Sequence, residues 1–299
     1  MCRKWNECTR CPVLWKKVDV KFPWRGGSQN EVTASFSKNL STSVRYMKLD
    51  FKDLRYWKKP LNFEELCVKL QKLCPYLQKL ILHHVKLSIN LMSAIALCSH
   101  FLPNVELLAF RYSEITDYYR KRDYEGAISK IKVLDLCKCV YIREFRDPVF
   151  PKMPYLEILN LAYSTADGYW FQDDFSFLNQ LHVLNASGTL IHSKAFETLK
   201  NHALNLTELY LCRTYVKDTD FTFDKSIFPH LKTVCLRRCF SVTSEGVVSL
   251  IQSCQSLEDI YVDEDMAESY AKHSFVVANR CKLKIVKIIH DCWHYCKID

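Results

Sequence analysis

One short pattern recurs through most of this chain at a nearly constant spacing. Leu206–Leu211, Leu231–Leu236 and Leu257–Val262 each carry aliphatic residues at the first, fourth and sixth positions, and they begin 25 and then 26 residues apart. The fourth and sixth positions alternate with their neighbours, as a strand with one buried face requires. A unit of this size cannot bury its own apolar face, so it must stack on neighbouring units.

The same pattern extends in both directions along the chain. Further copies begin at Val44, Leu77, Val105, Ile131, Leu156, Leu181 and Leu283. Between Leu77 and Leu283, consecutive copies begin 25 to 28 residues apart. This is the period of a leucine-rich repeat, in which each repeat adds one short strand to a parallel sheet. We therefore predict an α/β fold: a leucine-rich-repeat solenoid, curved as a horseshoe, with the parallel sheet on its concave face and helices on its convex face.

The composition supports one continuous stack of repeats. The chain has 299 residues, of which 48% are apolar and 13% aromatic, which is ample for an ordered core. We assign residues 21–291 to a solenoid of about ten repeats and residues 292–299 to a C-terminal capping tail. Residues 61–74 carry apolar side chains at helical spacing. Tyr112 to Ser129 is the most polar insert, and we expect a surface loop or short helix there.

Residues 1–20 do not follow the repeat. A short helix is expected around Cys2–Cys8, and a strand is expected to open at Lys16–Val20. These residues resemble the last third of an F-box, which typically reads C-[KR]-x-W, a short spacer, then P-x-L-W-x-x-[VL]-[DN]. The matching positions are Cys2, Lys4, Trp5, Pro12, Leu14, Trp15, Val18 and Asp19. We assign residues 1–20 to this C-terminal remnant of an F-box.

A second resemblance lies in the repeat that follows Cys239. Residues 239–257 are similar to the cysteine-containing repeat of F-box proteins, C-x-x-[IV]-[TS]-D-x-G-[LV]-x-x-[LI]-x-x-x-C-x-x-L. Thr243 is the expected N-cap of a helix that runs through Leu250. Position 9 of each repeat is expected to be a small residue inside the turn, where hydroxyls bond loop amides and thiols pack as small hydrophobes. The residues at position 9 are Cys139, Ser164, Thr189, Thr214 and Cys239.

The chain thus resembles the F-box/leucine-rich-repeat family, and the resemblance implies the substrate-recognition subunit of an SCF-type E3 ubiquitin ligase. In that family the F-box docks on a Skp-type adaptor linked to a cullin, and the solenoid holds a target protein for ubiquitination and proteasomal degradation. The implied adaptor-binding residues are Trp5, Pro12, Leu14 and Trp15. The first F-box helices, usually opened by L-P-x-E-[LI], are absent from the sequence, so we expect adaptor binding to be weakened or lost. The alternative is a scaffold or inhibitor protein of leucine-rich repeats without a ligase.

The concave sheet face is the expected target-binding surface. Positions 3, 5 and 7 of each repeat should point outward there, with position 8 beside them. Toward the C-terminus these positions carry Tyr and Arg, which are enriched in binding hot spots. The predicted site consists of Tyr210, Arg213, Arg237, Arg238 and Tyr261.

Two hypotheses compete for these arginines. Arg213 and Arg238 occupy position 8 of adjacent repeats, so their guanidinium groups are expected to converge on an acidic or phosphorylated target segment. The opposing hypothesis is that carboxylates on the same face neutralise the arginines internally. These carboxylates belong to Glu208, Asp259 and Asp263.

Charge and cysteine content narrow the class of protein further. The formal net charge is +9, but the lysines are scattered, which favours a solvated basic surface over nucleic-acid binding. No apolar run approaches the ~20 residues that span a bilayer, and no secretory signal follows Met1. The 15 cysteines are odd in number and several lie in strands, which favours reduced thiols in the cytoplasm or nucleus.

Several arrangements of Cys and His resemble chemical sites, but we expect each to be structural. Cys8-x-x-Cys11 lacks a second pair, and Cys137 and Cys139 should point to opposite sides of their strand. The C-terminal cluster His290, Cys292, His294 and Cys296 carries metal-ligand types, but a capping tail is favoured. No cysteine has the context of a nucleophile. We therefore expect a protein that is not an enzyme and needs neither metal nor cofactor.

Overall fold

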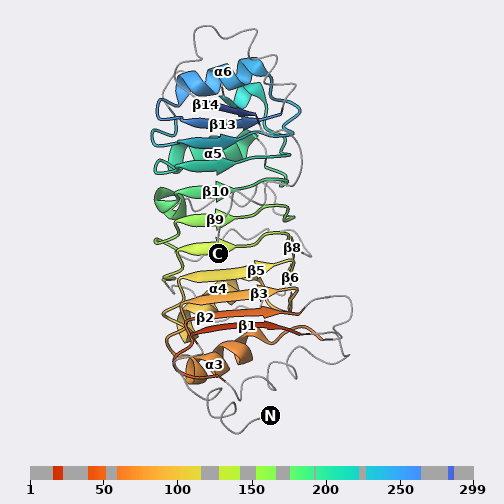
Figure 1. The fold of residues 1–299 in the computed structure, drawn as a ribbon, viewed down its shortest axis with the longest axis vertical. Helices are drawn as coiled ribbons and strands as arrows, with labels where there is room; N and C mark the ends of the chain where they lie inside the picture. The colour runs from red at the N-terminus through yellow and green to blue at the C-terminus, as the bar shows by residue number, and fades with distance from the viewer. Residues whose placement is uncertain are drawn as a thin grey trace, which may run out of the picture. The chain divides into compact units, whose positions relative to one another are not determined.

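The computed structural model describes residues 16–22, 40–51, 59–115, 128–141, 153–165, 176–191, 193–221, 227–263 and 282–285. They belong to two compact units, an N-terminal half (Met1–Tyr155) and a C-terminal half (Leu156–Asp299), each a stack of parallel strands (Figure 1). The predicted adaptor-binding residues lie outside the described residues, as do Cys8, Cys11 and the C-terminal Cys/His cluster.

The N-terminal half pairs its strands in chain order. The strands are β1 (Lys17–Lys21), β2 (Tyr46–Asp50), β3 (Lys79–His83), β5 (Leu107–Arg111) and β7 (Val133–Asp135). Equivalent repeat positions face each other, so Leu80 lies opposite both Met47 and Leu108. The buried position-4 side chains therefore form one column. β1 pairs with β2 along its whole length, so the sheet includes residues 17–20, which the sequence pattern groups with the F-box-like segment.

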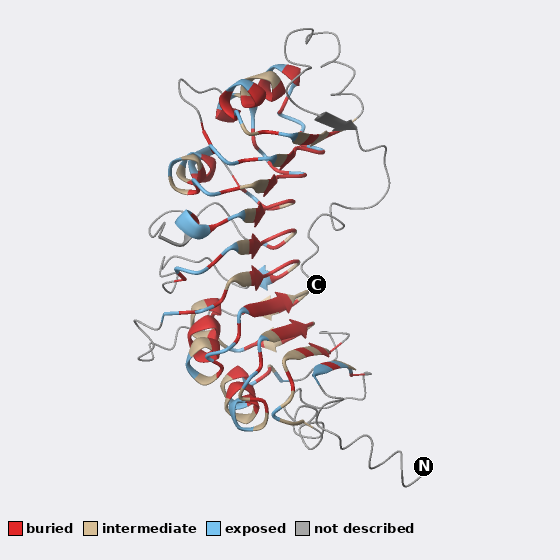
Figure 2. Cartoon of the chain, turned by 60° about the vertical axis from the view of Figure 1, so that its left-hand side comes forward, coloured by how far each residue is buried: buried red, intermediate tan, exposed pale blue. Residues whose placement is uncertain are grey.

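Two helices pack against this sheet, with their buried faces toward the strands (Figure 2). They are α3 (Phe63–Leu73), which confirms the predicted helical segment, and α4 (Leu91–Phe101). Each begins after an asparagine whose side chain accepts a hydrogen bond from the first turn: Asn62 from Glu65 N (3.1 Å) and Asn90 from Ser93 N (2.7 Å). No helix within the described ranges has the length and apolar character needed to cross a bilayer.

A second, smaller sheet follows the turn after each main strand. It consists of β4 (Lys86–Leu87), β6 (Glu114–Ile115) and β8 (Val140–Tyr141), paired in parallel. Position 11 points inward, since Leu87 and Ile115 are buried, whereas position 10 is at least partly exposed. The predicted loop therefore begins later than Tyr112, and residues 116–127 lie outside the described residues.

The C-terminal half repeats this arrangement. Its strands are β9 (Ile158–Asn160), β10 (Val183–Asn185), β11 (Glu208–Tyr210), β12 (Thr233–Cys235), β13 (Asp259–Val262) and β14 (Lys282–Ile285). Its helical segments are η5 (Ser176–Gln180), α5 (Ser193–His202), η6 (Asp218–Phe221) and α6 (Ser244–Ser253). Each of the ten predicted repeat segments thus contains or overlaps a strand.

The start of α6 confirms the predicted N-cap. Thr243 Oγ1 accepts a hydrogen bond from Glu245 N at 3.2 Å, and its own N and Oγ1 each donate to the Asp218 carboxylate at 2.7 Å. A Cβ atom added to Gly246 would overlap Asp218 Oδ1. Glycine at this position therefore permits the close packing of α6 on η6.

We expect Leu209→Asp to destabilise the protein by at least about 3 kcal/mol, because it would bury a charge without a partner. Leu209 is 1% exposed and pairs with Leu184 and Val234 in the neighbouring strands. Thr233→Asp is the matched control at a half-buried position of the next strand. Guanidinium unfolding of both variants checks this, and equal midpoints would contradict the assigned register.

Candidate functional site

Position 5, which we expected to point outward, is buried between its neighbours in the repeats from β3 to β12. At the same position, Lys48 in β2 and Tyr261 in β13 are half-buried. Adjacent parallel strands lie about 4.8 Å apart, so equivalent side chains on both sides cover one another. Along the middle strands this row is therefore a packed layer rather than an open surface. Its members, each at most 5% exposed, are Ile81, Ala109, Asp135, Asn160, Asn185, Tyr210 and Cys235.

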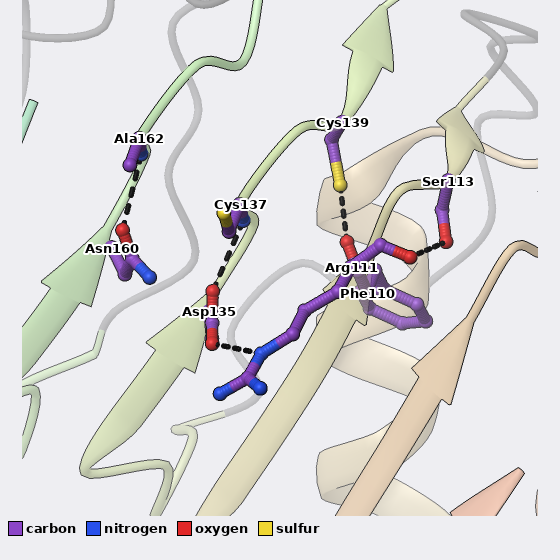
Figure 3. A network of polar contacts seen from close by, with 8 residues as sticks. All are labelled: Phe110, Arg111, Ser113, Asp135, Cys137, Cys139, Asn160 and Ala162. Atoms are coloured by element: carbon purple, nitrogen blue, oxygen red, sulfur yellow. Dashed lines mark hydrogen bonds and ion pairs between the residues drawn. The ribbon is translucent and has the colours of Figure 1, made fainter. Parts of the chain in front are cut away.

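The polar members of this layer have a structural task. The side chains of Asp135 and Asn160 each accept a hydrogen bond from the backbone N–H two residues later, at 3.0 and 3.1 Å (Figure 3). Asn185 accepts from Ser187 N in the same way at 3.0 Å. They thereby satisfy buried turn amides where each strand ends. Their polarity is accounted for by the fold and does not indicate a binding site.

Position 9 is buried as predicted, and its hydroxyls bond both amides and carbonyls. Ser113 Oγ accepts from Val85 N at 3.2 Å, as predicted. Thr189 Oγ1 and Thr214 Oγ1 instead donate to the carbonyls of Ala186 (2.6 Å) and Leu211 (2.7 Å). Cys239 Sγ donates to the Leu211 carbonyl at 2.9 Å, and Cys139 Sγ donates to the Phe110 carbonyl of the preceding repeat. Burial raises the pKa of both thiols. They therefore stay protonated and act as donors in addition to packing.

Position 8 has the left-handed backbone conformation in every repeat from β3 to β12. In each half the position-8 N–H continues the backbone ladder beyond the strand: Tyr112 N donates to Cys137 O at 2.9 Å, and Arg213 N donates to Arg237 O at 2.9 Å. A left-handed residue with a side chain costs about 1 kcal/mol or more, and glycine avoids this cost. We call these residues the position-8 row. They have φ between 55° and 66° and are His84, Tyr112, Lys138, Tyr163, Gly188, Arg213 and Arg238.

In the N-terminal half, the position-8 row forms an aromatic and cationic cluster. The His84 ring stacks on Tyr112 with centroids 5.0 Å apart, and Lys138 Nζ lies 5.4 Å from the Tyr112 centroid. Asp50 Oδ1 lies 2.9 Å from His84 Nδ1. Sequence reasoning did not single out this cluster. Its signal was a ring at position 8 in two consecutive repeats, followed by a cation in the third.

A buried ion pair lies beside this cluster. Arg111 Nε donates to Asp135 Oδ2 at 2.5 Å across neighbouring strands (Figure 3). The Asp135 side chain is fully buried, and its other oxygen accepts from Cys137 N. Arg111 therefore offsets a charge that the low-dielectric layer would otherwise disfavour.

In the C-terminal half, two residues of the predicted site are removed from the surface. Tyr210 is buried, and its hydroxyl donates to Glu208 Oε2 at 2.6 Å. Arg237 is 7% exposed, and its Nε lies 3.7 Å from Asp263 Oδ1. The hypothesis of internal neutralisation therefore holds for Arg237, and the prediction of an accessible Tyr210 and Arg237 was wrong.

Arg213 and Arg238 are exposed as predicted, but they do not converge. The Arg213 guanidinium lies 6.0 Å from the ring centroid of Tyr163, two repeats earlier, and so extends away from Arg238. Gly188 occupies position 8 of the repeat between those of Tyr163 and Arg213. A Cβ atom at Gly188 would lie 2.5 Å from Tyr163 Cδ1. The missing side chain allows the Tyr163 ring to lie across this repeat toward Arg213.

Comparisons with known proteins show the fold. No protein-family model matches the sequence, and no curated protein matches it. The crystal structure of the TLR13–ssRNA13 complex is similar with a TM-score of 0.51 and 19% identity, over 84% of this chain but only 34% of that chain. This chain therefore spans about a third of that protein's chain and has the leucine-rich-repeat solenoid fold that the repeat predicts.

Two further solved structures are more distant. The Rad7–Elc1 complex in yeast has a TM-score of 0.42 at 13% identity, over 86% of this chain and 76% of that chain. LegL7, a leucine-rich repeat-containing protein from Legionella pneumophila, has a TM-score of 0.40 at 15% identity, over 88% of each chain.

We expect Arg111→Met to cost about 3–5 kcal/mol, because it leaves the Asp135 carboxylate buried without its cation. Adding Asp135→Asn should restore most of the loss, because asparagine occupies the same position in the next two repeats and keeps the acceptor for Cys137 N. Chemical unfolding of the single and double variants measures both effects. A double variant no more stable than Arg111→Met would contradict this account.

Stability should also depend on His83. Burial, followed by the nearby Lys48 and Arg111 cations, lowers the pKa of its imidazole from 6.5 to about 4. The unfolded chain binds this proton first, so stability should fall as the pH drops from 6.5 toward 4. His83→Leu should reduce that slope in urea unfolding series, whereas His182→Leu, at an exposed imidazole, should leave it in place. An unchanged slope in His83→Leu would show that another group is responsible.

Proposed function

We propose that this chain is the substrate-recognition subunit of an SCF-type ubiquitin ligase and that it binds a target protein through its repeats. The observation that carries the binding role is the position-8 row. Six of its seven residues keep a side chain where glycine would be less strained, and such strain is commonly retained where it serves function. Half-exposed or exposed Tyr and Arg on a fixed backbone suit recognition, because little ordering is needed on binding.

The role we propose is non-catalytic. The cysteines within the described part of the chain are buried free thiols. Burial raises the pKa of Cys67, Cys98, Cys139 and Cys239, so these thiols are protonated and poor nucleophiles. We propose a location in the cytoplasm or nucleus, where such thiols stay reduced. The subunit would act by raising the concentration of its target beside the ubiquitin-carrying enzyme.

The ligase half of the proposal rests on the F-box-like residues. β1 begins two residues after Trp15 and pairs with β2 along five residues. A segment docked on a Skp-type adaptor and its cullin through Trp5, Pro12, Leu14 and Trp15 would therefore be joined to the stack of repeats by almost no linker. A short connection limits how far a bound target can move from the ubiquitin-carrying enzyme. It thereby raises the effective concentration of the target beside that enzyme.

Calorimetric titration of the 299-residue chain with a purified Skp-type adaptor tests this half. We expect a dissociation constant weaker than about 10 µM, because the first F-box helices are not in the titrated chain. Joining those helices ahead of Met1 should strengthen binding at least about tenfold. Leu14→Asp with Trp15→Asp in the extended chain should reverse the gain without lowering the melting temperature of the repeats.

Tight, stoichiometric binding by the 299-residue chain would support the ligase proposal and contradict only the expected need for further F-box helices. An extended chain that still fails to bind the adaptor would favour a scaffold or inhibitor protein that works without a ligase.

A further inference from the structure

Three large apolar side chains stand in the solvent at the same position of three successive repeats. Leu190, Tyr215 and Phe240 occupy position 10 and are 56%, 64% and 92% exposed. Each directly follows a buried position-9 residue. We call Leu190, Tyr215 and Phe240 the position-10 row. Aligned exposed apolar side chains of this size commonly mark an interaction site, whereas scattered ones do not.

Packing does not require an apolar residue at this position. In the N-terminal half, position 10 carries Lys86 and Glu114, which form a partly exposed ion pair at 3.1 Å, and Val140, which is 46% exposed. The inward residue of the same short segment is position 11, where Ile191 and Val216 are buried. The apolar side chains of the position-10 row are thus additional to those that build the core.

Exposed cations accompany this row. Arg213 and Arg238 lie two residues before Tyr215 and Phe240, and Lys217 follows Tyr215 by two. Three neighbouring carboxylates are buried or half-buried and are held by hydrogen bonds. Asp218 accepts from Thr243, Asp220 accepts from Lys217 N, and Asp263 accepts from Arg238 N and lies near Arg237. Glu245, in the first turn of α6, is exposed. Among the residues that the structure describes, the exposed charged side chains along this edge are thus three cations and one carboxylate.

We propose that the position-10 row, with Arg213 and Arg238, is a docking surface for an extended segment of a partner protein that places large apolar side chains beside carboxylates. Across three repeats the row spans about 10 Å, which matches about three residues of extended chain. The apolar side chains would bury the row, and the carboxylates would pair with the two arginines. A second copy of this chain fits less well, because its formal net charge is +9.

This inference deepens the proposed function, since on that function the docked segment is the recognition element of the target. It does not require the adaptor. A failed adaptor titration would not contradict the docking surface, and a failed peptide selection would not contradict adaptor binding.

Selection of a random peptide library on the whole chain tests the surface, and fluorescence anisotropy then measures binding of the enriched peptides. We expect enriched peptides to combine Phe, Leu or Trp with Asp or Glu. The triple variant Leu190→Ser, Tyr215→Ser, Phe240→Ser should weaken binding at least about tenfold. The control variant Tyr76→Ser, Leu204→Ser removes apolar side chains that are 55% and 50% exposed elsewhere and should bind like the parent.

A charge-reversal variant tests the role of the arginines. The double variant Arg213→Glu, Arg238→Glu should weaken binding of the acidic peptides at least about tenfold. A second selection on this double variant should enrich peptides that contain Lys and Arg instead. Enriched peptides without acidic residues, or undiminished binding by the triple serine variant, would overturn the proposal. So would sedimentation showing self-association that the triple variant abolishes, or binding of phosphatidylcholine vesicles through the same residues.

Discussion

The hydrogen bonds between successive repeats are the interaction on which the rest of this structure depends. A five-residue strand has no partner within its own repeat, so its N–H and C=O groups are satisfied only by the repeats on either side. The ladder continues past the strand to position 8, where Arg213 N still donates to Arg237 O. Everything that distinguishes one repeat from the next is attached to this shared backbone.

The shared backbone explains how side chains are sorted into rows. In each half, the described side chains at positions 4 and 9 stack on their equivalents in neighbouring repeats and are buried, as are those at position 5 from β3 to β12. Polar side chains in these rows are hydrogen-bonded within the fold: Asn185 accepts from Ser187 N, and Asp135 accepts from Arg111 Nε. Positions 8 and 10 lie at the turn that follows, where side chains reach solvent. Variation there changes the surface without changing the fold.

The strands could be predicted from the sequence because the leucine pattern repeats so often, and the structure has strands at those segments. The exposed surface could not be predicted as well. Alternation assigns Tyr210 to one side of its strand, but it does not show that Asn185 and Cys235 close over it at the strand spacing. Likewise, the sequence alone does not show that Arg237 is held by Asp263 while Arg238 is exposed. The left-handed turn was hidden because only Gly188 has the residue type that signals it.

The position-8 turn also bears on how such a chain diverges. Glycine is the residue that relieves its backbone strain, and Gly188 shows that the repeat accepts it. A mutation to glycine at any other member of the row would lower the conformational cost while deleting a side chain. Histidine, tyrosine, lysine and arginine nevertheless occupy six of the seven positions, so this chain keeps both the strained turns and the side chains that they present.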